Sequence, residues 1–163
     1  MGSDSDLTRM VKCLRVLEDY DVPYEVHVLS AHRSPDATAQ FASQAERRGI
    51  RVVIAAAGGA AHLAGVIAAH TTLPVIGVPI DSSPLLGLDA LLATVQMPPG
   101  VPVATVGVGA MGAANAGHLA VTILSLGDVA LRRRLVAHRR RMARDVAAKA
   151  RSLPTKLAEL LGR

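Results

Sequence analysis

The chain has 163 residues, half of them hydrophobic, and its mean hydropathy of +0.34 excludes a disordered polyelectrolyte. Its 18 basic and 13 acidic residues give a net charge of +5, which taken whole would suit a nucleic-acid-binding protein. The charge is unevenly distributed, however, because residues 1–131 carry a net −4 and residues 132–163 carry +9. Tyr, Phe and Trp together make up only 2% of the chain, too few for a base-stacking surface, so we predict no nucleic-acid partner.

Two uncharged stretches, 52–80 and 90–127, have the length of membrane spans. Both are rich in alanine and interrupted by glycine and proline, which favours buried elements of a parallel sheet covered on both faces. The chain opens on Met1-Gly-Ser-Asp with no charged-then-apolar leader, and its lone Cys13 cannot form an internal disulfide. We therefore predict no membrane partner and a cytoplasmic location.

The first half of the chain alternates between helical and strand patterns. After Ser5-Asp6, apolar residues recur every three or four positions, which predicts a helix that ends before Pro23. Residues 24–29 alternate with period two and are rich in β formers, so they predict a strand. A second helix is predicted from Ser34-Pro35-Asp36 to Arg48, with Gly49 as its stop.

The same alternation continues from residue 51 onward. Strands are predicted over 51–56, 74–78 and 102–106, and helices over 60–70, 86–95 and 112–126. Short glycine-rich connections between alternating strands and helices indicate a parallel sheet with helices on both faces. We predict an α/β fold, a three-layer α/β/α sandwich with a doubly wound parallel sheet of the flavodoxin-like kind.

The two ends of the chain depart from a simple sandwich. Asp128 is a predicted N-cap for a long basic helix that reaches about Arg151 and is broken by Pro154, so we divide the chain into a domain over 1–127 and an extension over 128–163. The modest apolar stripe of this helix fits packing on a neighbouring subunit or on its own domain. At the other end, no strand precedes the opening helix, although the first turn of such folds normally follows one. Either a strand is missing from this version of the sequence or the sheet is one strand short.

Three turns rich in small and polar residues lie where open α/β sheets bind ligands, at the carboxyl ends of strands. Each turn also has an explanation that needs no ligand. In chain order, the first would be a plain helix cap, the second an exposed polar loop, and the third a tight turn that needs positive φ. Exposed backbone N–H groups and hydroxyls would bind an anion or a sugar, an arginine fork suits phosphate, and a histidine titrates near neutral pH. The turns are Gly2-Ser3-Asp4-Ser5-Asp6, Ser30-Ala31-His32-Arg33-Ser34-Pro35 and Ala57-Gly58-Gly59-Ala60-Ala61-His62-Leu63.

Other catalytic patterns are absent from the sequence. No pair of histidines has metal-ligand spacing with an acid nearby, so a zinc site is not expected. The nucleophile elbow and the P-loop are missing as well. Gly107-Val-Gly109 with Gly112 resembles a dinucleotide fingerprint but lacks the acid that should follow about twenty residues later. The match to that fingerprint is therefore weak.

Together the three turns resemble the signature turns of PurE, the class I N5-carboxyaminoimidazole ribonucleotide mutase family. Three further segments match in order, so the resemblance covers residues 2 to about 126: Pro74-Val-Ile-Gly-Val-Pro79, Gln96-Met-Pro98 and Ala113-Ala-Asn-Ala116. The sequence departs from the family at Ala64, where proline is frequent, and at Ala55–Ala57, where another glycine is common.

The resemblance implies an isomerase that converts N5-carboxyaminoimidazole ribonucleotide into 4-carboxyaminoimidazole ribonucleotide in de novo purine biosynthesis. The conversion would proceed by decarboxylation and recarboxylation, with neither a metal nor an organic cofactor. It implies that His32 is the general acid and base. The ribose phosphate end of the substrate would be held by Ser3, Ser5, Asp6, Ser30 and Arg33, and the migrating carboxylate by Gly58, Gly59, Ala60, His62 and Leu63. It also implies a homo-octamer, for which the C-terminal helix would serve assembly.

Three alternatives remain beside this hypothesis. The nearest is the class II enzyme of the same fold, which carboxylates aminoimidazole ribonucleotide directly. A nucleic-acid binder using residues 132–151 would lose affinity steeply with salt. The third is a phosphosugar-binding relative without catalytic activity.

Overall fold

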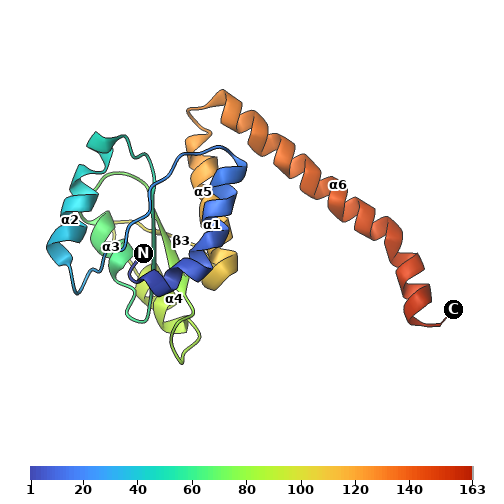
Figure 1. Ribbon diagram of the computed structural model, residues 1–163, viewed down its shortest axis with the longest axis horizontal. Helices are drawn as coiled ribbons and strands as arrows, with labels where there is room; N and C mark the ends of the chain where they lie inside the picture. The colour runs from blue at the N-terminus through green and yellow to red at the C-terminus, as the bar shows by residue number, and fades with distance from the viewer. Residues whose placement is uncertain (163) are drawn as a thin grey trace. The chain divides into compact units, whose positions relative to one another are not determined.

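Three parallel strands form the sheet of the protein in its computed structural model, which describes residues 1–162 (Figure 1). The strands are β1 (Val53–Gly58), β2 (Val75–Ile80) and β3 (Ala104–Thr105), and they lie side by side in that order. β1 and β2 pair along their full lengths, whereas β3 is a two-residue bridge on the far edge of β2. The parallel sheet was predicted, and its third strand is shorter than expected.

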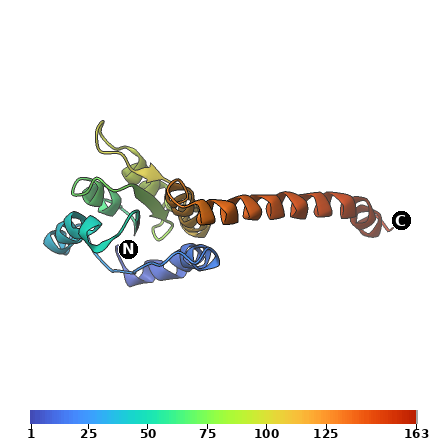
Figure 2. The ribbon, with the colours of Figure 1, turned by 90° about the horizontal axis from the view of Figure 1, so that it is seen from above.

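Helices cover both faces of this sheet (Figure 2). One layer contains α3 (Leu63–Ala68) and α4 (Leu88–Val95), with α2 (Pro35–Gln44) beside α3. The other contains α5 (Gly109–Leu124), which contacts β2 and packs along α1 (Leu7–Asp19). The predicted three-layer α/β/α arrangement is therefore confirmed.

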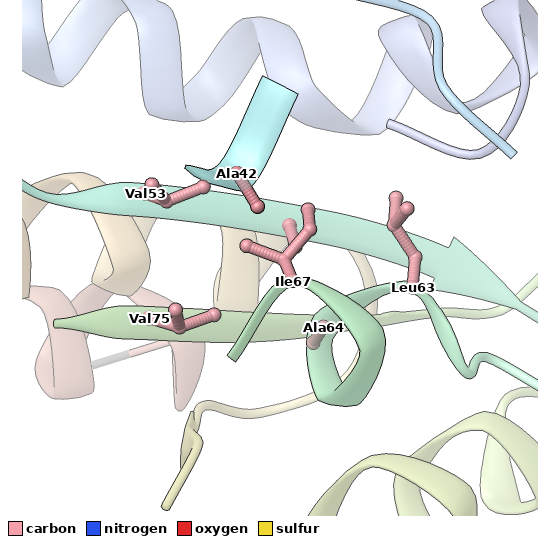
Figure 3. Close-up of a cluster of buried hydrophobic side chains, with 7 residues drawn as sticks. Ala42, Val53, Leu63, Ala64, Ile67 and Val75 are labelled. Carbon is pink, nitrogen blue, oxygen red and sulfur yellow. The ribbon is translucent and has the colours of Figure 1, made fainter. Parts of the chain in front are cut away.

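One part of the core lies between the sheet and α3. Val53, Ala55 and Val75 project from the strands toward α3, because alternate strand residues face the same layer. Figure 3 shows Val53 and Val75 beside a small cluster of apolar side chains from the helices, each at most 3% exposed: Ala42, Leu63, Ala64 and Ile67. Burying a side chain of the size of leucine or isoleucine contributes roughly 1.5–3 kcal/mol, so this cluster fixes α3 and the turn that precedes it.

On the opposite layer, α1 and α5 approach closely at Gly117. A Cβ at this position would lie 2.9 Å from Val16 Cβ and 3.0 Å from the Cys13 carbonyl oxygen. Glycine is thus required for the contact that holds α1, and α1 in turn carries the first of the three turns.

The prediction of a strand over Tyr24–Leu29 is wrong. These residues form an irregular segment, and among residues 1–162 only Met1 pairs with its backbone: Met1 N–H donates to His27 O and Leu29 N–H donates to Met1 O. A strand needs a neighbouring backbone along its length. Its apolar residues Tyr24, Val26 and Val28 are 42–56% exposed, so the alternation is present without the partner that would use it.

Several helix boundaries also differ from the predicted ones. α3 begins at Leu63 rather than at residue 60, because Gly59 and Ala61 adopt positive φ values of 61° and 41° and prolong the turn. α2 ends at Gln44, and a 3-10 turn, η2 (Glu46–Arg48), completes the segment before Gly49, whose φ of 86° confirms it as the stop.

The structure separates the chain into two compact units, Met1–Leu124 and a second that begins at Ser125. The second unit contains α6 (Val129–Leu160), capped by Asp128, whose Oδ1 accepts from Leu131 N–H over 2.9 Å. The predicted break at Pro154 is wrong, because the helix continues through it and bends in its last turns (Figure 1). Proline removes one intrahelical hydrogen bond, but on an exposed helix water satisfies the freed carbonyl. Within residues 1–162, no helix combines the length and apolar character that a bilayer span requires.

Candidate functional site

The first turn folds around Ser3 and Asp6. Ser3 N–H donates to Asp6 Oδ2 over 3.1 Å, and Ser3 Oγ accepts from the backbone N–H of Ser5, so the two residues form a capping box on η1 (Asp4–Asp6). Asp6 is also the N-cap residue of α1, although its side chain makes no cap hydrogen bond to that helix. Gly2 N–H donates to Ala56 O over 2.9 Å, which places this turn at the carboxyl end of β1, where ligands bind in such sheets.

Asp6 is a buried carboxylate, 4% exposed, at the base of this turn. Burial raises its pKa, and the hydrogen bond from the Ser3 N–H and the nearby Met1 ammonium only partly oppose that effect. Ser5 is exposed, and its hydroxyl donates to Ser3 Oγ over 2.8 Å. The turn therefore presents hydroxyl groups at its surface above a carboxylate that is held by the backbone.

The second turn is tied to the first by Arg33. Its Nη2 donates to Gly2 O over 3.0 Å, and its Nε donates to Ser30 Oγ over 3.3 Å. Ser30 Oγ also accepts from Arg33 N–H, so serine and arginine fix each other's orientation. Arg33 is exposed and keeps donors available for an anionic ligand.

The third turn meets the second through two histidines. His32 Nε2 lies 2.7 Å from His62 Nδ1, and the rings are perpendicular, with centroids 4.9 Å apart. One ring nitrogen must carry the hydrogen in this contact and the other must accept it, so a proton is held between the two imidazole rings. The pair is exposed, which leaves it accessible to a ligand.

Gly58 and Gly59 shape the third turn for different reasons. Gly59 has a φ of 61°, which favours glycine. At Gly58, a Cβ would overlap Ser82 Oγ and lie 3.3 Å from the Ile80 carbonyl oxygen, so a side chain would collide with the segment after β2. Ala60 is exposed at the tip of the turn, whereas Leu63 is 2% exposed in the core and supports the turn from below.

The structure thus brings all three predicted turns together at one end of β1. Sequence reasoning missed the loop after β2, which contributes Asp81 and Ser82. Arg9 of α1 forms a two-pronged ion pair with Asp81, 2.8 Å and 3.3 Å long, and this pair lowers the pKa of the Asp81 carboxyl. The signal for these residues was a polar run, Asp81-Ser-Ser, directly after a buried strand. In the part of the chain that the structure describes, no three His, Cys, Asp or Glu side chains group as metal ligands would.

Comparison with known proteins identifies relatives over most of the chain. The family model described as AIR carboxylase matches residues 1–145. N5-carboxyaminoimidazole ribonucleotide mutase of Pyrococcus abyssi is 56% identical over 144 residues, which cover 88% of this chain and 82% of that protein. The enzyme of the same name from Mycobacterium tuberculosis is 55% identical over 149 residues, covering 91% and 84%.

The fold has close structural counterparts as well. A crystal structure of Treponema denticola PurE superimposes with a TM-score of 0.85 and covers 94% of both chains, at 24% sequence identity. At this identity the likeness concerns the fold, and it agrees with the flavodoxin-like arrangement predicted from the sequence.

Proposed function

The chain belongs to the AIR carboxylase family, and on this premise we propose that it is an isomerase that converts N5-carboxyaminoimidazole ribonucleotide into 4-carboxyaminoimidazole ribonucleotide in purine biosynthesis. The observation that carries the proposal is the position of His32, 2.7 Å from His62 where the three turns meet. A proton-transferring group at this place is what a carboxyl migration requires, and relatives more than half identical to this chain carry the mutase name.

In the proposed reaction, His32 first donates one proton and later removes another. The bond between the carbamate carbon and the exocyclic nitrogen breaks, CO₂ is released, and His32 donates its proton to that nitrogen. CO₂ then forms a bond to the ring carbon, and His32 removes the proton which that carbon carried. His32 ends in its starting state, so the step balances without another reactant. Holding CO₂ in place makes its second bond formation effectively intramolecular.

The surrounding groups are assigned to the two ends of the substrate. The hydroxyl groups of Ser3 and Ser5, with Arg33 oriented by Ser30, would bind the ribose phosphate end, because guanidinium forks and N–H groups suit phosphate. Asp6, held by the Ser3 N–H, would accept from a ribose hydroxyl. The turn Gly58-Gly59-Ala60, followed by His62 and backed by Leu63, would surround the migrating carboxylate with backbone N–H groups.

His62 has a second role in this proposal. Its contact with His32 fixes the ring orientation of the acid–base group and provides a hydrogen-bond partner in either protonation state.

The exposed apolar residues Val136, Met142 and Val146 of α6 support the proposal that residues 128–163 are an assembly extension of a catalytic domain over 1–127. The proposed assembly is a homo-octamer, which light scattering of the full chain would test. The single buried thiol of Cys13 suits a reducing cytoplasm, the proposed location.

The experiment that tests the function is an absorbance assay of the purified chain with each candidate ribonucleotide. We expect conversion of the N5-carboxylated substrate in buffer free of bicarbonate. Product formation only from the uncarboxylated ribonucleotide, and only with bicarbonate, would instead identify a direct carboxylase. Binding of either compound without turnover would identify a relative without catalytic activity.

A further inference from the structure

The loop over residues 81–87, which follows β2, reaches the candidate site beside the third turn. This loop closes on itself, because Gly87 has a φ of 86° and a Cβ added there would lie 3.2 Å from Asp81 Cα. Inside the loop, Ser83 Oγ accepts from Leu85 N–H over 3.1 Å. A compact loop that is packed by its own groups keeps its shape, so the residues at its base have defined positions.

Asp81 anchors the base of this loop to two helices. Its carboxylate accepts both prongs of the ion pair from Arg9, which lies in the first turn of α1. The same carboxylate packs against the start of α5, where a Cβ added at Gly109 would lie 3.3 Å from Asp81 Oδ1. Because α1 also carries the first turn of the site, Arg9 joins that turn to the loop after β2.

Ser82 places its hydroxyl on the third turn of the site. A Cβ added at Gly58 would overlap Ser82 Oγ and lie 3.3 Å from Ser82 Cβ, so this hydroxyl occupies the space that glycine leaves open. Ser82 is exposed, and within residues 1–162 the hydrogen bonds that close the loop use Ser83 instead. The Ser82 hydroxyl therefore keeps its donor available for a ligand on this turn.

We propose that Ser82 is a further substrate-binding residue, whose hydroxyl donates to the migrating carboxylate, and that Arg9 and Asp81 position it. The inference rests on the proposed function, which places that carboxylate beside Gly58 and Gly59. There the hydroxyl adds a side-chain donor to the backbone N–H groups of the turn. A carboxylate can accept several hydrogen bonds, and a bond to an ionised acceptor is stronger than one between neutral groups.

The ion pair of Arg9 and Asp81 also balances charge beside the proposed carboxylate. Asp81 directly precedes Ser82, and an unpaired carboxylate at this place would repel the carboxylate of the substrate. The hydrogen bond from Arg9 lowers the pKa of the Asp81 carboxyl, so the pair is fully formed at neutral pH, with the guanidinium offsetting the negative charge. Loss of Arg9 should therefore weaken binding of a carboxylated ligand, and an asparagine at position 81 should relieve that effect.

The test measures equilibrium binding of two ribonucleotides, one with the carboxylate and one without it. Ser82→Ala removes the proposed donor. Ser43→Ala is its matched control, because Ser43 is an exposed serine of α2 whose hydroxyl donates to Gln40 O of the same helix. We expect Ser82→Ala to weaken binding of 4-carboxyaminoimidazole ribonucleotide by about fivefold and to leave binding of aminoimidazole ribonucleotide unchanged. Ser43→Ala should change neither affinity.

A double substitution tests the positioning role of Arg9. Arg9→Ala leaves the Asp81 carboxylate unpaired and should weaken binding of the carboxylated ribonucleotide by about fivefold. Adding Asp81→Asn removes the repelling charge and should recover most of that affinity, which a merely structural role for Arg9 would not allow. Arg15→Ala, at an exposed arginine further along α1, is the control and should bind both ribonucleotides as the wild type does.

Three results would overturn the proposal. Unchanged affinity of Ser82→Ala for the carboxylated ribonucleotide would exclude the contact, and an equal loss for both ribonucleotides would move it to the phosphoribosyl end. Failure of Asp81→Asn to recover affinity in the Arg9→Ala chain would exclude the positioning role. Because these measurements use binding, a chain that binds both ribonucleotides without isomerising the substrate would contradict the proposed function alone. A wild-type chain that binds neither would contradict both.

Discussion

Arg33 Nη2 donates to the carbonyl oxygen of Gly2 over 3.0 Å, joining two turns that lie 31 residues apart in sequence. The same side chain donates from Nε to Ser30 Oγ. Arg33 therefore holds the first and second turns of the candidate site in register, besides presenting charge to a ligand. Its two duties can be separated by substitution.

Arg33→Ala should raise KM by on the order of tenfold or more, because both the phosphate contact and the link to Gly2 are lost. Arg33→Lys keeps the charge but not the fork, so it should recover part of the affinity. Steady-state kinetics of the two variants would check this. An unchanged KM in Arg33→Ala would show that the guanidinium does not contact the substrate.

His62 should act through His32 rather than on the substrate's phosphate end. His62→Ala removes the partner 2.7 Å from His32 Nε2 and should lower kcat about tenfold, with a smaller change in KM. His62→Asn places a polar side chain near the former Nδ1 and should recover part of the loss. If His62→Ala changed KM alone, a positioning role for His62 would be excluded.

Gly58 should tolerate no side chain while Ser82 is present. Gly58→Ala brings Cβ onto Ser82 Oγ, so the third turn must shift, and kcat/KM should fall by about tenfold or more. Adding Ser82→Ala removes the overlapping oxygen and should restore part of the activity. Gly127→Ala is the control, because nothing lies within 4 Å of its added Cβ. Equal activity of Gly58→Ala and Gly127→Ala would contradict the packing described for this turn.

The ionised carboxylate of Asp6 should lower the stability of the folded protein at neutral pH, while it contributes to binding of the ribonucleotide. Burial raises its pKa, so the folded protein holds this proton more tightly than the unfolded chain does. Its contribution therefore favours folding at low pH and is lost as the pH rises from about 4 through the folded-state pKa.

Asp6→Asn keeps an acceptor for the Ser3 N–H and removes the buried charge. We expect its thermal midpoint at pH 7 to equal or exceed that of the wild type, and its affinity for the ribonucleotide to fall. Thermal unfolding at pH 5 and pH 7, with a binding titration, would check both. A clearly lower midpoint at pH 7 would show that the ionised carboxylate stabilises the turn.

The sequence predicted those parts of the fold that depend on local patterns. Gly49 was identified as a stop because its position demands a positive φ, and Asp128 as a cap because it precedes a long helix. The prediction of a strand over Tyr24–Leu29 failed because an alternating pattern indicates which residues a strand would bury, but not whether a neighbouring backbone is there to pair with it. The predicted helix break at Pro154 failed because an exposed helix loses little stability when water replaces one backbone hydrogen bond.

The candidate site shows the same division. Its second and third turns could be found from serine, glycine and histidine after predicted strands, and its first turn from glycine and serine directly before the opening helix. Their mutual contacts could not, because the approach of His32 to His62 and of Arg33 to Gly2 depends on how α2 and α3 pack. Asp81 and Ser82 were missed because their importance arises from contacts with Arg9 and Gly58 rather than from a motif.

The central claim is that His32 transfers the proton during carboxyl migration, and turnover of His32→Asn in bicarbonate-free buffer tests it most directly. His70→Asn is the matched control, since His70 is an exposed histidine just after α3 whose Nδ1 lies 2.8 Å from Val66 O of that helix. We predict that His32→Asn unfolds at the wild-type midpoint and isomerises N5-carboxyaminoimidazole ribonucleotide about 100-fold more slowly or worse, while His70→Asn keeps wild-type turnover. Turnover of His32→Asn equal to that of His70→Asn would contradict the account.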